Sequence, residues 1–309
     1  VFEVQRAYFS LNAGFGQREA AQAFLKDAKA NHDAAKAKLD NGLGTSQDAL
    51  QAQAQLAKAQ YDLDGATAQI EKARAELAAV LGLPVSSAVA IERVDEIPDA
   101  QKMDKQVGDL MAEALRTRPT LLAQYANLKQ AQHAAEAARS DFGPRVVAFG
   151  QYDYNRVRMG EDYSYNQWSV GVALQWDLFT GFQRSYQLID AKQQEKAARE
   201  ALRAGELEII SQVWEYFYAY KSAAQQVESA RKQLEAQQKA YDAISEGYRS
   251  GLNSFLDLMT AANDLASSRQ MKVQAVGNLG TSLAGLAHAT GNVELTTPES
   301  QVNTYREQK

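Results

Sequence analysis

The sequence predicts a mainly α-helical fold, built from long antiparallel helical hairpins and carrying one β-hairpin. Residues 1–83 align with residues 210–292 at a constant offset of 209, without a gap. All five prolines lie outside the segments with helical periodicity. Residues 168–176 instead alternate between apolar and polar side chains. Because a gapless offset preserves helix lengths as well as residue types, we expect two copies of one helical hairpin.

The first copy of the hairpin covers residues 1–83. Within residues 1–40, small and apolar residues such as Ala21, Leu25 and Ala28 recur at spacings of three and four, which is typical of a coiled-coil-like seam. The glycine-containing stretch 41–44 ends this helix. Thr45 or Ser46 can then cap a second helix that runs to residues 81–82.

The rest of the chain divides into five further segments. Residues 84–118 are expected to form a connection that is irregular up to about residue 104 and includes a short strand there. A helix is expected from 106 to 140, with a break near Arg118-Pro119; its part within 119–143 belongs to the second copy. Residues 144–180 are expected to form the β-hairpin, 181–292 the second long helical hairpin and 293–309 a C-terminal tail. The first helix of 181–292 would run from Gln183 to Arg249, a length of about 100 Å.

The β-hairpin is expected to pair strands 146–157 and 168–176 through a turn at 159–162. The second strand places alternate apolar side chains on one face, from Trp168 to Trp176, with the two indoles roughly 26 Å apart. An apolar stripe bracketed by aromatic residues is typical of a membrane β-barrel strand; a half-buried strand of a soluble sheet is the alternative. One hairpin cannot close a barrel, so a membrane location would require oligomerisation.

Composition excludes several classes of function. The net charge of −5 argues against a nucleic-acid partner, and the absence of cysteine excludes disulfides and thiolate metal sites. The three histidines, His32, His133 and His288, lack the spacing of metal ligands. No nucleophile has a matching base, and no phosphate-binding loop is present. We therefore expect no enzymatic activity, no cofactor and no metal. The chain also has no run of 18 apolar residues that would form a transmembrane helix.

The order of these elements resembles the TolC-like outer-membrane efflux protein family. Arg118-Pro119 resembles the family's Arg-Pro-Asp-Leu box, with Thr120 in place of Asp. Residues 176–185 resemble its strand-to-helix box, Pro-Leu-Phe-x-Gly-Gly, with Asp177 in place of proline and Phe182 in place of the second glycine. The turns at 41–48 and 250–257 match in both repeats.

The resemblance implies a homotrimer in the bacterial outer membrane. Each protomer would give four strands to one shared β-barrel in outer-membrane lipid, and the helices would form an α-barrel across the periplasm. The function implied is that of a passive exit duct in a tripartite efflux or type I secretion system, fed by a periplasmic adaptor (membrane fusion) protein and an inner-membrane transporter. A soluble coiled-coil scaffold or adaptor is the alternative. The offset places Val1 at the level of Ile210, inside a helix. We therefore expect the start of that helix, a strand hairpin and another helix to precede Val1.

The two turns between helices are the first candidate site. Gly42 and Gly251 suit positions just past helix ends. Leu43 and Leu252 are apolar residues at exposed turns, which fits docking of the adaptor at the periplasmic tip implied by the resemblance. Local packing of the helix caps is the alternative.

The resemblance also implies gating residues next to these turns. Asp48 and Asp257 lie in the first turn of a helix, where the dipole favours a carboxylate; in the family, acidic residues at this level form rings around the pore. Tyr248 matches a tyrosine that bonds to the neighbouring hairpin, with Asp48 as the candidate partner. Thr260 and Asn253 stand where the family has a second acid and a gating arginine, which makes its closed-state network doubtful here.

Aromatic residues of the β-hairpin are the candidate membrane interface. Trp168, Trp176, Tyr152 and Tyr154 are assigned to this role, and Tyr152 and Tyr154 cluster with two more tyrosines, Tyr163 and Tyr165, near the hairpin turn. Such a cluster would form the outer aromatic girdle of a barrel. A soluble sheet would bury these rings instead.

Overall fold

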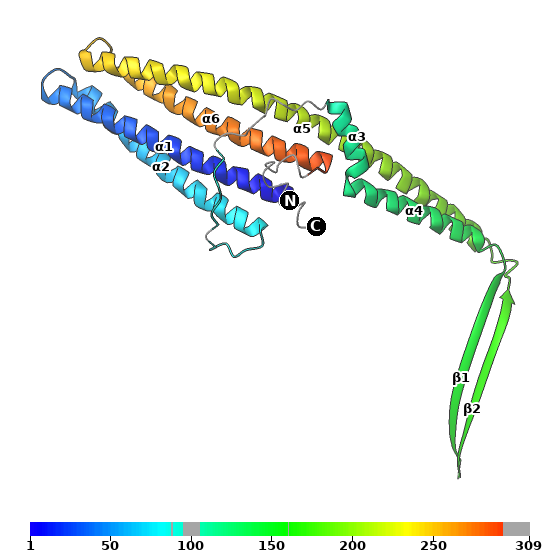
Figure 1. Cartoon of the computed structure of the whole chain (residues 1–309). Coiled ribbons are helices and arrows are strands. Elements are labelled where there is room, and N and C mark those ends of the chain that lie inside the picture. Colours follow the sequence, from blue (N-terminus) through cyan, green and yellow to red (C-terminus); the bar gives the residue numbers. More distant parts are fainter. Residues whose placement is uncertain (88, 95–105, 160, 293–309) are drawn as a thin grey trace, which may run out of the picture. The chain divides into compact units, whose positions relative to one another are not determined.

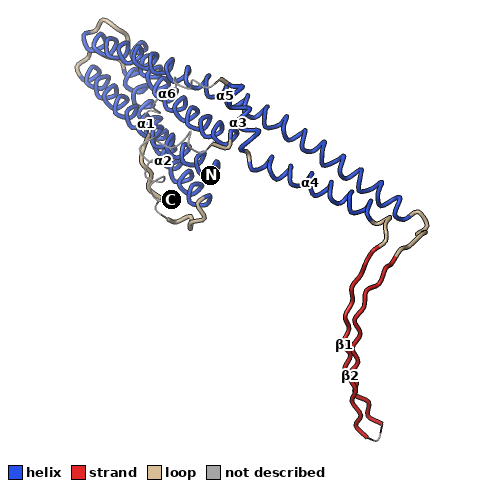
Figure 2. The backbone as a smooth tube through the Cα atoms, turned by 45° about the vertical axis from the view of Figure 1, so that its right-hand side comes forward, coloured by secondary structure: helices blue, strands red, loops and turns tan. Residues whose placement is uncertain are grey.

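A computed structural model describes residues 1–87, 89–94, 106–159 and 161–292. Helices dominate the described chain, and two strands form its β-hairpin (Figures 1 and 2). Contacts divide the chain into two compact units, residues 1–117 with 209–309, and residues 118–208. In order, the elements are α1 (Phe2–Asp40), α2 (Ser46–Val80), α3 (Val107–Thr117), α4 (Pro119–Ser140), β1 (Arg145–Met159), β2 (Glu161–Gln175), α5 (Gln183–Ser250) and α6 (Phe255–Thr290).

In the first unit, the two turns that join long helices are built alike. Gly42 and Gly251 both adopt positive φ angles, of 71° and 81°, which glycine tolerates without a steric penalty. The amide of Leu43 donates to the carbonyl of Lys38 over 2.8 Å, and the amide of Leu252 donates to the carbonyl of Gly247 over 2.7 Å. These bonds span the same six residues, so both helices end in the same type of C-terminal cap.

The helices that follow the two turns also begin and end in the same way. Thr45 and Ser254 are the N-caps, and their side chains accept hydrogen bonds from the amides of Asp48 and Asp257. At the far ends, glycines 82 and 291 both have φ of 72°. Each of these pairs is related by the offset of 209, so the structure confirms two copies of one helical hairpin.

Small residues allow α1 to pack closely against α6. A Cβ atom added at Gly277 would lie 3.2 Å from the Cβ of Ala13, and one added at Gly16 would lie 2.9 Å from the side chain of Val273. Gly280 leaves no room for a side chain because the ring of Phe9 covers it. On its other side, α1 packs against α2 through an apolar cluster that includes Leu11, Ile70 and Leu77.

After α2, residues 89–94 run along α1 and are held by its side chains. The Tyr8 hydroxyl donates to the carbonyl of Glu92 over 2.7 Å. The Asn12 amide donates to the carbonyl of Val94 over 2.8 Å and its oxygen accepts from the Val94 amide over 3.1 Å. No strand forms in residues 84–87 and 89–94, although a short strand was expected in this connection. The Asn12 side chain bonds the main-chain amide and carbonyl of Val94, which would pair with a neighbouring strand in a sheet. Residues 95–104 of that expectation lie outside the described chain.

The second unit contains α4, the first part of α5 and the β-hairpin. Arg118 precedes α4 in an extended conformation and Pro119 occupies its first turn, which confirms the predicted break because proline disfavours a helical residue before it. The strands pair antiparallel from Arg145 with Gln175 to Met159 with Glu161. Both strands extend farther toward the hairpin turn than predicted, because main-chain pairing continues beyond the segment in which apolar and polar side chains alternate.

Candidate functional site

The turns after α1 and α5 lie side by side at one end of the first unit (Figures 1 and 2). At their tips, Leu43 and Leu252 expose 80% and 85% of their surface. The sequence predicted two exposed apolar turns, and the structure shows them next to each other. Gly42 and Gly251 hold the backbone conformation that presents the leucines.

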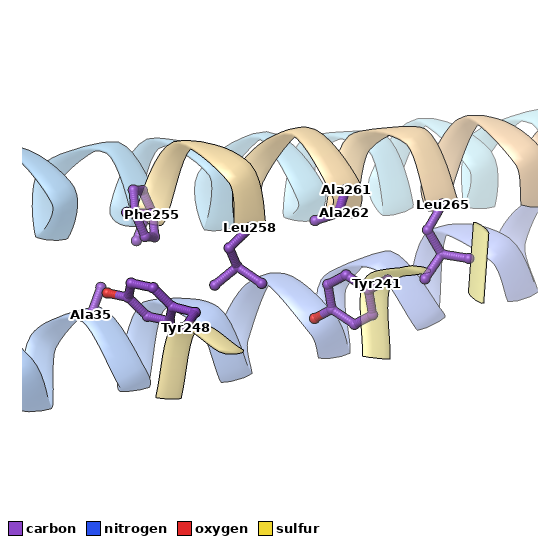
Figure 3. Packing of buried hydrophobic residues seen from close by; sticks show 9 residues of the cluster. Ala35, Tyr241, Tyr248, Phe255, Leu258, Ala261, Ala262 and Leu265 are labelled. Atoms are coloured by element: carbon purple, nitrogen blue, oxygen red, sulfur yellow. The ribbon is translucent and has the colours of Figure 1, made fainter. Parts of the chain in front are cut away.

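Behind the tips, an apolar cluster joins the two hairpins. Figure 3 shows Tyr248 of α5 beside Ala35 of α1, with Phe255 and Leu258 of α6 above them. The ring of Tyr248 lies 5.7 Å from that of Phe255, and only 5% of the Tyr248 surface is exposed. The cluster also includes Ala35, Ala52, Leu258, Ala261, Ala262 and Leu265. Since Ala35 and Ala52 belong to the first hairpin, this cluster fixes one turn against the other.

Lys38 makes the polar contact between the hairpins at this level. Its ammonium group donates a hydrogen bond to the carbonyl of Tyr248 and lies 4.0 Å from the centre of the same ring, an arrangement in which the ring attracts the cation. Asp48, the expected partner of Tyr248, affects the Tyr248 hydroxyl through the negative charge of its carboxylate. Burial, and then the Asp48 carboxylate, raise the pKa of the Tyr248 hydroxyl. The resemblance implied a bond from Tyr248 to the neighbouring hairpin; in the structure, the hydrogen bond from that hairpin is donated by Lys38 to the backbone carbonyl of Tyr248.

Asp48 and Asp257 occupy the third position of their helices, but only Asp257 completes a capping box. The Asp257 carboxylate accepts from the Ser254 hydroxyl over 2.7 Å and from the Ser254 amide over 3.0 Å. These bonds lower the pKa of Asp257 below its ordinary value of 3.8, the hydroxyl contributing most. Because the pKa is lowered in the folded chain, the contact stabilises the fold above pH 3.8 and is lost as the pH falls through the lowered value.

Thr260 and Asn253, which depart from the gating pattern that the resemblance implied, make hydrogen bonds within their own hairpin. The Thr260 hydroxyl donates to the carbonyl of Leu256 over 2.9 Å, which is an ordinary contact one helical turn back. The amide of Asn253 donates to the carbonyl of Gly247 over 3.1 Å.

A polar network that sequence reasoning missed ties the hairpins together farther from the tips. Arg269 of α6 donates to Asp27 of α1 over 2.6 Å and to Gln238 of α5 over 3.1 Å. The side chains of Arg269 and Asp27 are only 17% and 22% exposed. Next to this pair, the Tyr241 hydroxyl donates to the Asn31 side-chain oxygen over 3.1 Å. These partners are far apart in sequence, and no local pattern marks them.

The β-hairpin, described by itself, separates its side chains into two different faces. Directly paired residues share a face, so Trp168 lies beside Tyr152. The three apolar residues that follow Trp168 on this face, Val170, Val172 and Leu174, are each more than 70% exposed. The opposite face carries polar residues including Gln151, Asp153, Gln167 and Ser169.

Two aromatic residues do not lie where the expected strands placed them. Tyr154 pairs with Asn166 and shares the face of Trp168, but Tyr165 pairs with Asn155 and lies on the opposite, polar face. The cause is the period of two along a strand, which places neighbouring residues on opposite faces. Trp176 lies just beyond β2, which ends at Gln175; its indole donates to the carbonyl of Phe142 over 3.1 Å. The side chain of Tyr163 lies outside the described residues.

Within the described ranges, no helix combines the length and the apolar character needed to cross a membrane. The same part of the chain contains no group of three or more His, Cys, Asp or Glu side chains placed to hold a metal ion.

Comparison with known proteins decides the family. The model of the outer membrane efflux protein family matches residues 1–83 and 110–292. The chain belongs to this family. It is 27% identical over 278 residues to the outer membrane efflux protein BepC of Brucella suis biovar 1 (strain 1330), a match that covers 88% of the chain and 59% of BepC. The chain thus spans about three-fifths of the length of this relative.

Solved channels share the fold. The outer-membrane channel OprN superposes with a TM-score of 0.82 at 24% identity, over 95% of this chain and 66% of OprN. The open state of the Neisseria gonorrhoeae MtrE outer membrane channel gives a TM-score of 0.80 at 22% identity, over 96% of this chain and 67% of MtrE.

Family membership confirms the resemblance that was stated from the sequence. The chain is a mainly helical member of an outer membrane efflux family, as its resemblance implied. The solved structures that share its fold are outer-membrane channels.

Proposed function

We propose that the complete protein is a passive exit duct of the outer membrane, gated at the paired turns. The observation that carries the proposal is the family match over both helical hairpins and the region of the strand hairpin. In this proposal three copies share one β-barrel in outer-membrane lipid, and their helical hairpins form an α-barrel in the periplasm. An inner-membrane transporter supplies the energy through a periplasmic adaptor protein.

The β-hairpin supports the membrane part of this proposal. Its apolar face, from Trp168 to Leu174, is exposed in a single copy. The hydrocarbon chains of lipids can cover such a face because they bring no polar groups against it. The opposite face carries polar residues toward the turn, including Gln151, Asp153, Gln167 and Ser169, and Val147 and Phe149 nearer the helices; polar side chains are typical of the lumen of a barrel. Trp168, Tyr152 and Tyr154 lie on the lipid side and serve as its aromatic interface; Trp176 marks the other end of the stripe.

The exposed turns support the adaptor and gating parts. Leu43 and Leu252 are exposed apolar side chains, one on each turn, which suits docking of an adaptor by Gly42-Leu43 and Gly251-Leu252. Asp48, Tyr248 and Asp257 lie directly behind the turns, and three-fold symmetry would repeat each carboxylate around a pore. In the same scheme, the described residues of 84–118 lie around the middle of the duct; residues 293–309, which were expected to form a C-terminal tail, lie outside the described residues.

Planar-bilayer recordings on the complete protein test this function. Wild-type protein, extracted with detergent, should form trimers that conduct ions with a preference for cations. Asp257→Ala should lower that preference because it removes one carboxylate per copy at the narrow end. Asp264→Ala, on the same helix but two turns farther from the tip, serves as the control and should change the preference less. Wild-type protein that is recovered without detergent and forms no channels would refute the proposal.

A further inference from the structure

The two ends of the β-hairpin carry different patterns of charge. At the helix end, two arginines are each paired with a carboxylate, Arg145 with Asp141 over 2.7 Å and Arg184 with Asp177 over 2.8 Å. Arg145 also lies on the face opposite the apolar one. At the turn end, by contrast, Arg156 belongs to the same face as the apolar residues.

Arg156 shares this face with the aromatic residues. It follows Tyr152 and Tyr154 at the spacing of two that keeps side chains on one face of a strand. Its direct partner on β2 is Ser164, and the partner of Tyr154 is Asn166. Arg156, Ser164 and Asn166 are all exposed. Beyond its aromatic residues, the apolar face therefore ends in a group of hydrogen-bond donors.

The spacing along the strand places Arg156 at the level of lipid headgroups in the proposed barrel. Ten residues separate Trp176 from Asn166, which is about 33 Å of strand and, at a tilt of about 40°, a height of about 25 Å. The apolar band of an outer-membrane barrel has this height. Arg156 belongs to the next pair on the face, about 5 Å higher, and therefore lies just outside the hydrocarbon.

The turn end of this face has an excess of positive charge. Arg156 contributes one charge, and the next pair on the face, Arg158 with Asp162, contains one residue of each sign. The acidic residue of β1, Asp153, lies on the opposite face. A guanidinium group has five N–H donors, so Arg156 can bond within the protein and still bind a phosphate. The neighbouring hydroxyl and amide side chains supply further donors.

We propose that Arg156, with Ser164 and Asn166, binds the phosphate group of an anionic lipid whose acyl chains lie against the apolar face. This inference rests on the proposed function, because a barrel in the outer membrane brings lipid to this face. Arginine can bind a phosphate through two parallel hydrogen bonds, while the rings of Tyr152 and Trp168 contact the acyl chains. Because the two arginines at the helix end are paired with carboxylates, the preference for anionic lipid applies to the leaflet at the turn.

Native mass spectrometry of the complete protein tests this lipid site. Trimers in detergent micelles that contain equal amounts of phosphatidylglycerol and phosphatidylcholine should retain phosphatidylglycerol preferentially. Arg156→Gln should reduce this preference about five-fold, the factor expected for one cation at an anionic lipid surface. Arg156→Lys keeps the charge and should retain part of the preference. Arg145→Gln is the matched control, because Arg145 lies on the opposite face and is paired with Asp141; it should keep the wild-type preference.

A second pair of variants leaves Arg156 in place. Ser164→Asp puts a carboxylate directly opposite Arg156 and should also remove the preference for phosphatidylglycerol. Ser169→Asp, in the same strand but on the opposite face, should leave the preference unchanged. Inorganic phosphate distinguishes a lipid from a free ion: it should not displace bound phosphatidylglycerol, because it cannot replace the contacts of the acyl chains with the apolar face.

Two results would overturn the lipid site and leave the proposed function standing. One is a trimer that conducts ions but retains both lipids equally. The other is an equal loss of preference in Arg156→Gln and Arg145→Gln, or in Ser164→Asp and Ser169→Asp. Displacement of phosphatidylglycerol by inorganic phosphate would overturn the lipid as the occupant. Wild-type protein that forms neither trimers nor channels would overturn both the site and the proposed function.

Discussion

Replacing Arg269 by methionine should destabilise the first unit by about 2–3 kcal/mol. Methionine keeps most of the length of the side chain but removes the charge and both hydrogen bonds, to Asp27 over 2.6 Å and to Gln238 over 3.1 Å. Asp27 would then retain its charge while being only 22% exposed. The remaining exposure keeps the cost below the 3–5 kcal/mol typical of a fully buried pair. The thermal midpoint should fall by several degrees.

Thermal unfolding of the complete protein in detergent, followed by far-ultraviolet circular dichroism, measures this effect. Lys239→Gln is the matched control, because its pair with Glu235 is as short, at 2.7 Å, but mostly exposed; its midpoint should stay at the wild-type value. Asp27→Asn with Arg269→Met should cost less than the sum of the single variants, since neither partner is then left charged and unpaired. Equal midpoints for Arg269→Met and Lys239→Gln would refute the argument that burial gives the pair its strength.

Two further predictions concern close packing and the faces of the β-hairpin. Gly280→Ala should lower the thermal midpoint, with a cost of about 1–3 kcal/mol, because the added methyl group would overlap the ring of Phe9; Gly65→Ala, where the added group meets nothing within 4 Å, should raise the midpoint. Val172→Arg should greatly reduce the amount of trimer in outer membranes, because a cation facing lipid costs about 2–4 kcal/mol near the midplane. Its neighbour Ala173 lies on the opposite face, so Ala173→Arg should assemble normally, and equal losses for both variants would contradict the assignment of the faces.

Local sequence signals were sufficient to predict the helical hairpins. Thr45 and Ser254 cap their helices, and Gly42 and Gly251 end the preceding ones, because caps depend on the few residues around them. The break before Pro119 follows from the same kind of local constraint. The constant offset supplied what single signals lack, namely the equal length of the paired helices.

Contacts between the hairpins could not be predicted in the same way. Lys38 and Tyr248 are separated by 210 residues, and their contact depends on how far one helix slides along another. The same holds for Asp27 and Arg269. On an isolated helix each of these polar side chains suits a solvated surface, so only the register of packing shows that they meet. In the β-hairpin, side-chain alternation defined the apolar face, but the main chain continued to pair beyond it, as far as Met159.

Equivalent positions of the two turns make different contacts. The offset relates Lys38 to Gly247 and Gly44 to Asn253. In the first turn, a Cβ atom at Gly44 would lie 3.0 Å from that of Lys38; in the second, a Cβ atom at Gly247 would overlap the side chain of Asn253. The two positions face each other across the turn, so in each repeat one of them is glycine and the other carries a side chain. The first turn keeps the side chain on the helix before the turn, and there Lys38 reaches the ring and carbonyl of Tyr248. In the second turn, the side chain is that of Asn253, after the turn, and the equivalent of Lys38 on α5 is Gly247. Because α5 has no side chain at this position, it cannot make the equivalent contact with the first hairpin. At this level the hairpins are therefore linked by Lys38 of the first turn.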